Sequence, residues 1–249
     1  MTRASPPAVP NVLLAALPAA DYKRLLPELE SVELAFGEIL HEQGAPITHV
    51  YFPEDSLVSL LTVVDGRSAL EVGMVGREGM LGVACAMGAT TTPFRTLVQG
   101  AGLATRIKVA DFRREIALHG TLQRQVNLYT YTLLSQVSKT AACNRFHQLP
   151  ERLARWLLMT RDRMQSDSFR LTHAFLGHML GVRRVGVTRA AHSLRARGLI
   201  EYHRGAIDIL DGRGLEAAAC SCYEPSGASP DQWAATGGSK RAVSRRTTS

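Results

Sequence analysis

The sequence predicts an α+β protein with a β-rich N-terminal half, one long central helix and a helical C-terminal half that closes in a short hairpin. Three observations predict this fold class: short apolar runs separated by glycines between residues 32 and 107, an apolar stripe at helical spacing from about Val109, and two short helical patterns divided by a glycine after residue 171. The 249 residues, 45% of them hydrophobic, suffice for two domains with a core each. No apolar run approaches the roughly 20 residues that span a bilayer, so we expect no membrane partner.

The first residues predict an amphipathic helix rather than an export signal. Asn11 suits the N-cap position, and the apolar residues after it share one helical face. The uninterrupted apolar stretch Val12–Leu17 is short for a signal peptide, and prolines crowd the residues before it. We therefore expect a cytoplasmic protein without a leader, with a second helix over Tyr22–Glu30.

The β-rich half carries turn signals as well as short strands. Asp65-Gly66 lies between two apolar runs and predicts a hairpin, because a type I′ turn needs positive φ at both central residues. Strands at roughly ten-residue spacing are typical of a barrel or sandwich. Glycines recur at every third position from Gly73 to Gly82, which fits neither strand nor helix. Tight turns or close backbone approach explain this series, and a phosphate cradle is the weaker alternative.

The central helix has an apolar stripe that alternates in steps of three and four, as in a coiled coil. One explanation is a buried helix of a single domain. We favour a dimer seam, because a helix this long has more apolar stripe than a small barrel can cover. The residues expected at this dimer interface are Leu122, Val126, Tyr129, Leu133 and Val137.

The positive charge of the chain is concentrated in its C-terminal part. The formal net charge is +7, yet residues 1–147 hold 13 basic and 13 acidic side chains. Residues 148–223 hold 12 arginines, no lysine and 7 acidic side chains, and residues 224–249 add 4 basic and 2 acidic groups. This distribution predicts a polyanion partner for the C-terminal half alone.

Residues 171–210 predict a helix-turn-helix followed by a wing. Thr172 can cap the first helix, Gly181 suits a left-handed residue at the turn, and Val182 is expected to fill the corner between the helices. The second helix, about residues 183–197, then directs apolar side chains inward at positions i, i+4 and i+7. Two short strands around an Arg-Gly turn complete the wing.

The outward face of the second helix predicts contact with duplex DNA. Arginine can bond two acceptors of guanine in the major groove, while a hydroxyl and the helix N-terminus suit phosphate. The alternatives are a solvated arginine face or a helical module without a nucleic-acid partner. The residues expected at the DNA are Arg183, Arg184, Val185, Thr188, Arg189, His192 and Arg204.

The helix-turn-helix with its wing resembles the C-terminal domain of the Crp/Fnr family of bacterial transcription regulators. The resemblance covers about residues 12–223 and implies a cyclic-nucleotide-binding-like β-roll, a dimerisation helix and a winged helix. It also implies a homodimer on a pseudo-palindromic site, with half-sites roughly 34 Å apart, and RNA polymerase as a further partner. The expected divisions are a sensory β-roll at 12–117, a dimerisation helix at 118–147, a winged helix-turn-helix at 148–223 and a disordered tail at 224–249.

The family signature in the recognition helix is Arg-Glu-x-x-x-Arg, and this chain departs from it. Arg184 and Arg189 occupy the two arginine places, but Val185 stands where the glutamate is expected, so the operator is expected to differ from the family's commonest one. Cyclic-nucleotide binders in the family use a Gly-Glu pair for the ribose and an Arg-Ser/Thr pair for the phosphate. Here Gly82 is followed by a valine. Only Arg95-Thr96 imitates the phosphate pair, so cyclic AMP is not the expected effector, and the effector stays unidentified.

No catalytic residues, cofactor or metal site are expected. The N-terminal cysteine cluster of the iron–sulfur branch of the family is missing. Cys220 and Cys222 form a Cys-x-Cys that could bind metal or respond to oxidants, but only two ligands are within reach and no histidine has a partnered spacing. An alternative function is a cupin-like β-barrel metalloenzyme, for which His41, Glu42 and His49 are the candidate ligands. They lack the paired His-x-His that such a site needs, so we expect no enzyme.

Overall fold

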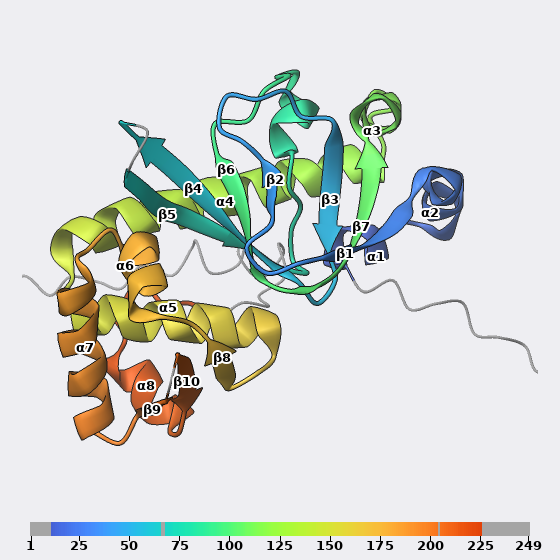
Figure 1. The fold of residues 1–249 in the computed structure, drawn as a ribbon. Helices are drawn as coiled ribbons and strands as arrows, with labels where there is room; N and C mark the ends of the chain where they lie inside the picture. The colour runs from blue at the N-terminus through green and yellow to red at the C-terminus, as the bar shows by residue number, and fades with distance from the viewer. Residues whose placement is uncertain (1–10, 66–67, 204, 226–249) are drawn as a thin grey trace, which may run out of the picture.

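The chain folds into a β-roll, a long helix and a C-terminal helical domain that packs beneath the roll (Figure 1). This computed structural model describes residues 11–65, 68–203 and 205–225. The predicted α+β class, with its β-roll, long helix and winged helix, is therefore confirmed. The tail expected at 224–249 lies almost wholly outside the described residues.

The chain enters the roll through a short helix that its cap residue fixes in place. The Asn11 side chain accepts hydrogen bonds from the backbone N–H groups of Leu13 and Leu14, as an N-cap should. Its Nδ2 donates to the carbonyl oxygens of Pro53 and Gly79, at 2.8 and 2.9 Å, which anchors the helix to the roll. The elements of this lead-in are α1 (Val12–Ala15), α2 (Ala19–Leu25) and the 3-10 helix η1 (Leu26–Glu28).

The β-roll consists of two antiparallel sheets with strand orders β1-β7-β3 and β2-β6-β4-β5. The predicted hairpin joins β4 to β5: Val64 pairs with Ser68, and Asp65 has a φ of +52°. Gly66 lies outside the described residues. The strands are β1 (Glu30–Leu34), β2 (Ile39–His41), β3 (His49–Pro53), β4 (Leu57–Val64), β5 (Ser68–Val75), β6 (Arg95–Gly100) and β7 (Gly102–Lys108).

The glycine series that follows β5 allows the roll and the long helix to approach closely. A Cβ atom at Gly79 would lie 2.3 Å from the Tyr129 ring, so no larger residue fits there without displacing the ring. Gly82 has a φ of +86° at the start of the 3-10 helix η2 (Val83–Met87). Close approach and a tight turn therefore explain these two glycines.

The long helix α4 (Thr121–Phe146) follows α3 (Val109–Ile116) and lies against the roll. Its predicted apolar stripe faces inward. Leu122, Val126, Tyr129 and Leu133 are at most 7% exposed within a single chain, and Val137 packs against the same core. Four of the residues assigned to the dimer seam are thus covered by the roll of the same chain, and Val137 is partly buried, so the stripe predicted from the sequence is not the exposed face of α4. The roll covers the whole stripe because its glycines let α4 approach so closely.

The C-terminal domain surrounds α5, and a three-stranded sheet of order β8-β10-β9 forms its wing. The side chain of Gln148 and that of Glu151 form a reciprocal capping box at the start of α5. Leu57, Leu61 and Met74 of the roll share one apolar cluster with this domain, so the domain packs on the roll. The elements are α5 (Leu149–Met164), β8 (Ser168–Arg170), α6 (His173–Leu180), α7 (Arg184–Ala196), β9 (Ile200–His203), β10 (Ala206–Ile209) and α8 (Gly212–Ala218).

None of the helices in the described part of the chain is both long and apolar enough to cross a membrane.

Candidate nucleic-acid interface

Helices α6 and α7 form a tight helix-turn-helix. The Thr172 hydroxyl accepts a hydrogen bond from the Phe175 N–H at 3.1 Å and so caps α6, as predicted. Gly181 ends α6 with a φ of +63°, in the left-handed region that the turn requires. A Cβ atom at Gly177 would lie 2.9 Å from the carbonyl oxygen of Val182, so this glycine lets the turn close against α6. The sequence did not single out Gly177.

Helix α7 has one buried face and one exposed arginine-rich face. Val187, Ala190, Ala191 and Leu194 are buried in the domain core. The residues predicted to contact DNA lie on the opposite face, and among the described residues no carboxylate forms an ion pair with its arginines at positions 183, 184 and 189. The exposed residues of this face are Arg183, Arg184, Val185, Thr188, Arg189 and His192. Arg204, predicted at the wing turn, lies outside the described residues.

A histidine on α6 joins this face to the wing. His173 Nδ1 lies 3.0 Å from the Thr188 hydroxyl, which also donates to the Arg184 carbonyl oxygen at 3.1 Å. The His173 ring stacks on Tyr202 of β9 with 4.1 Å between centroids. Burial, together with the positive charge of Arg184, lowers the pKa of His173, which favours the neutral imidazole. Sequence spacing gave no signal for this contact, because it depends on the packing of separate elements.

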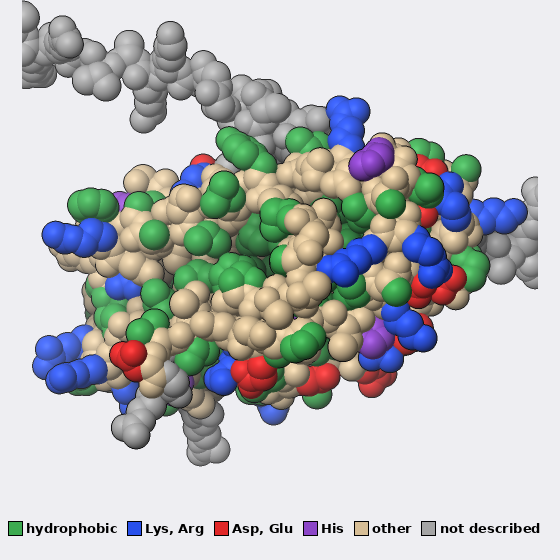
Figure 2. Space-filling model, turned by 90° about the horizontal axis from the view of Figure 1, so that it is seen from above, with side chains coloured by type: hydrophobic (Ala, Val, Ile, Leu, Met, Phe, Trp, Pro, Cys, Tyr) green, Lys and Arg blue, Asp and Glu red, His purple; other side chains and the backbone are tan. Residues whose placement is uncertain are grey.

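The β-roll contains an apolar cavity of about 240 Å³ between η2, the loop before β6 and α4. Figure 2 views this end of the molecule from above and shows apolar side chains gathered in a hollow. Gly82 and Thr96, two of the predicted effector residues, line the cavity, but Arg95 does not. The Arg95 guanidinium instead pairs with Glu42 at 2.8 Å. No charged side chain is among the lining residues in the described part of the chain.

The candidate ligands of a cupin-like site do not converge. His41 Nε2 lies 3.0 Å from the carbonyl oxygen of His49, and the His49 Nδ1 lies near the Thr48 hydroxyl. The Glu42 carboxylate is engaged by Arg95. These side chains therefore form separate local contacts, which gives the alternative metalloenzyme function no geometric support.

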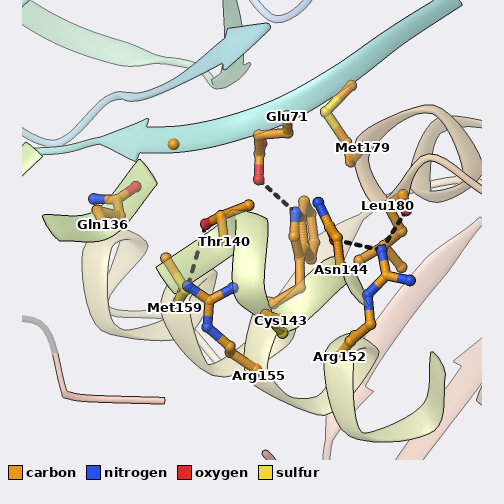
Figure 3. A pocket seen from close by; sticks show the side chains of 12 residues that line it. Glu71, Gln136, Thr140, Cys143, Asn144, Arg152, Arg155, Met159, Met179 and Leu180 are labelled. Atoms are coloured by element: carbon orange, nitrogen blue, oxygen red, sulfur yellow. Dashed lines mark hydrogen bonds between the residues drawn. The ribbon is translucent and has the colours of Figure 1, made fainter. Parts of the chain in front are cut away.

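A small polar pocket lies where the roll, α4 and the C-terminal domain meet (Figure 3). Glu71 of β5 accepts a hydrogen bond from Trp156 Nε1 of α5 at 2.8 Å. Arg152 donates to Asn144 Oδ1 at 2.6 Å and to the Leu180 carbonyl oxygen at 2.5 Å. These buried contacts hold the C-terminal domain to the roll and to the end of α4.

Glu71 is the most perturbed carboxyl group of this junction. Its burial raises the pKa to about 7, although the hydrogen bonds that it accepts oppose the rise. Its second carboxylate oxygen is buried without a hydrogen-bond partner in the described part of the chain. The contact between the roll and α5 therefore includes a group that changes charge near neutral pH.

Four potential metal ligands meet at the other side of this junction. Cys143 and His147 of α4 lie beside Cys220 and Cys222, which follow α8, and the four ligand atoms are within 4.8 Å of one another. The expectation that only two ligands are within reach was therefore wrong. The spacing of four between Cys143 and His147 was the available signal, because it places both on one helix face. A hydrogen bond with the Cys143 thiol lowers the pKa of Cys220.

Comparisons with known proteins agree with this geometry. Residues 151–218 match the family of Crp-like helix-turn-helix domains. A Crp/Fnr-family regulator from Eubacterium rectale has a similar structure, with a TM-score of 0.67, 19% identity and coverage of 83% of this chain and 97% of that one. FixK2 from Bradyrhizobium japonicum has a TM-score of 0.66 and 14% identity, with coverage of 78% of this chain and 98% of that one. A CRP-family regulator from Thermus thermophilus has a TM-score of 0.66 and 18% identity, with coverage of 78% of this chain and 100% of that one. No curated protein is similar enough in sequence to count as a relative.

Proposed function

The chain carries a Crp-like helix-turn-helix domain on the fold of the Crp/Fnr transcription regulators, and from this premise we propose that it binds specific DNA sites as a homodimer. The observation that carries the proposal is the exposed face of α7, where arginines project without neutralising carboxylates among the described residues. The nearest ion pair on this helix, Arg195 with Glu201 at 2.8 Å, lies in its last turn, behind that face.

Four residues of the exposed face have assigned roles in the proposed complex. Arg184 and Arg189 contact base edges in the major groove, where an arginine can bond O6 and N7 of guanine. Arg183 precedes the helix and contacts phosphate together with the helix N-terminus. Val185, which is 54% exposed, offers an apolar contact to a thymine methyl group in place of the glutamate of the family signature.

The proposed dimer forms through the outward face of α4. Its exposed residues alternate in steps of three and four, which is the spacing of a coiled-coil seam. Tyr131 and Leu134 are 64% and 63% exposed and supply the apolar centre of this face. A homodimer would place two α7 helices on half-sites about 34 Å apart. The residues of this seam are Arg124, Asn127, Tyr131, Leu134, Ser138 and Ala141.

The cavity in the roll is the proposed effector site. Because its lining is apolar and without charge, it suits a small apolar molecule better than a nucleotide phosphate. Leu134 both lines the cavity and lies on the proposed seam. A bound effector would therefore touch the dimer contact directly, and residues 12–117 would act as the sensory part of a regulator that contacts RNA polymerase from its DNA site.

Genome-wide mapping of DNA bound by the chain tests the proposal. Sites should share one inverted repeat, and the double variant Arg184→Ala, Arg189→Ala should lose them. Arg213→Ala is a matched control, because Arg213 is an exposed arginine of the same domain on α8, away from α7. Recovery of the same sites with the double variant would contradict the proposed role of α7.

A further inference from the structure

We propose that Cys143, His147, Cys220 and Cys222 bind one zinc ion that fastens the end of the C-terminal domain to the end of α4. The site is separate from the arginine face of α7 and from the cavity of the roll. The metal binding itself does not depend on the proposed DNA binding, whereas its effect on DNA affinity does.

Two of the distances between ligand atoms are close to those of a tetrahedral site, and all four atoms lie within 4.8 Å of one another. The sulfur atoms of Cys143 and Cys220 are 3.4 Å apart, and Cys222 Sγ lies 3.6 Å from His147 Nδ1. With zinc–sulfur bonds of about 2.3 Å and zinc–nitrogen bonds of about 2.0 Å, tetrahedral geometry places two sulfurs about 3.8 Å apart and sulfur and nitrogen about 3.5 Å apart. Small side-chain adjustments are therefore enough to accommodate the ion.

The backbone places both ligand pairs before any metal arrives. Cys143 and His147 are one helical turn apart, and the His147 N–H donates to the Cys143 carbonyl oxygen at 3.1 Å. After α8 a turn, closed by the Tyr223 N–H on the Cys220 carbonyl oxygen at 2.9 Å, brings Cys220 and Cys222 to the same side. Preformed ligands lose little conformational freedom on binding, which favours affinity.

The donor set suits a structural zinc ion. Three thiolates and one imidazole form a closed set of the kind found in structural zinc sites, with no position left for substrate. The four ligand atoms lie too close together for an iron–sulfur cluster, whose ligands are bound to different iron atoms. Cys143 and Cys220 are buried, and Cys222 and His147 are partly buried, so the site is shielded from water.

A buried arginine balances the charge of the site. Zinc with three thiolates and a neutral imidazole has a net charge of −1. Arg155 is only 8% exposed, donates to the Cys222 carbonyl oxygen at 3.3 Å and to the Thr140 hydroxyl at 3.4 Å, and forms no ion pair with a carboxylate among the described residues. Arg155 therefore compensates the negative charge of the site and holds the backbone at Cys222 in place.

The site closes a loop around the whole C-terminal domain. Cys143 lies in the last turn of α4 and His147 is the residue that caps its end, whereas Cys220 and Cys222 come after α8. The ion would thus fix how α5, and with it α7, is oriented relative to α4. In the proposed regulator, loss of zinc would weaken DNA binding without any change to α7.

The first test measures zinc in the full-length protein purified under reducing conditions without chelator. The parent and Cys85→Ala, whose cysteine is buried in the roll, should hold one zinc per chain, whereas Cys143→Ala and Cys220→Ala should hold almost none. A parent without zinc, or zinc retained by Cys220→Ala, would overturn the proposal. A Cys143–Cys220 disulfide in the freshly isolated parent would also overturn it, in favour of a redox pair.

A second test does not require any variant to fold. Cobalt(II) titrated into the reduced, metal-free parent should saturate at one equivalent, with the intense visible bands of tetrahedral cobalt and thiolate-to-cobalt absorption that zinc then abolishes. A weak octahedral spectrum would refute the site. Removal of zinc from the parent should lower its affinity for a mapped DNA site at least tenfold. The Cys85→Ala variant, which keeps its zinc, should bind that site as tightly as the zinc-loaded parent. If zinc binds at one per chain but neither form binds DNA, the metal site stands and the proposed DNA binding fails.

Discussion

Arg184 and Arg189 are five positions apart on α7, and both side chains are exposed. An arginine guanidinium binds most strongly when it donates hydrogen bonds to two acceptors at once. The exposed Arg189 and the buried Glu71 can both be tested without knowing the signal that the protein senses.

Arg189→Ala should weaken binding to a mapped site by about 1–3 kcal/mol and relax the preference at one base pair, because a bidentate contact with guanine is lost. Fluorescence anisotropy with the site and its single-base variants measures both effects. Arg213→Ala removes the same charge away from α7 and should leave base preference unchanged. If Arg189→Ala weakens binding to every sequence by one factor, Arg189 contacts phosphate rather than a base.

Glu71→Gln should alter how stability depends on pH. The folded-state pKa of about 7 exceeds the ordinary value of 4.5, so between these values the folded chain keeps a proton that the unfolded chain releases. The Glu71 carboxyl therefore makes stability fall as pH rises from about 4.5 to 7, by on the order of 3 kcal/mol, after which its effect is constant.

The glutamine variant keeps an oxygen acceptor for Trp156 and removes this dependence, so it should be more stable than the parent at pH 8 and nearly equal to it at pH 4.5. Urea unfolding across this pH range provides the measurement, and Glu42→Gln, at a more exposed carboxylate on the surface, is the control. An identical pH slope for the parent and Glu71→Gln would contradict the assignment.

At the scale of elements, local signals in the sequence predicted local structure well. Asn11 and Thr172 cap their helices, Gly181 ends α6 in the left-handed region, and the β4–β5 hairpin forms around Asp65. Each of these depends on a few neighbouring residues, which is why pattern and turn chemistry suffice to find them. The short strand β8 was not predicted, because it becomes a strand only through pairing with β10.

The face of α4 shows where local patterns stop being informative. The apolar stripe was real, but periodicity alone cannot say which partner covers it. The roll covers it in each chain, since Gly79 leaves room for Tyr129. The same limit applies to the four potential metal ligands. Cys220 follows His147 by 73 residues, and only the packing of α8 and α5 brings the Cys-x-Cys next to Cys143 and His147.

The seam proposed on α4 predicts that Leu134→Glu yields monomers, because it places two like charges face to face in the dimer contact. Light scattering or sedimentation at micromolar concentration measures the mass. Leu118→Glu is a matched control: Leu118 is also an exposed leucine, at 58%, but it lies before α4 begins. A Leu134→Glu variant with the same dimeric mass as the parent would contradict the proposed seam on α4.

At the scale of the whole molecule, one packed unit links three regions with different tasks. The cavity of the roll reaches the outward face of α4, the end of α4 reaches the four potential metal ligands, and these adjoin the domain that carries α7. These regions are therefore joined by contiguous contacts along α4. The net charge of +7 fits this division, since residues 1–147 are neutral and the excess lies with the proposed DNA reader.

Whether α7 binds specific duplex DNA is decided by equilibrium binding of the purified chain to a mapped site and to a scrambled duplex over a series of salt concentrations. We expect a preference of at least about 10³ for the mapped site and an affinity that falls linearly with salt on logarithmic axes, because phosphate contacts release counterions. Equal affinity for the two duplexes, or binding that does not respond to salt, would contradict specific DNA binding by α7.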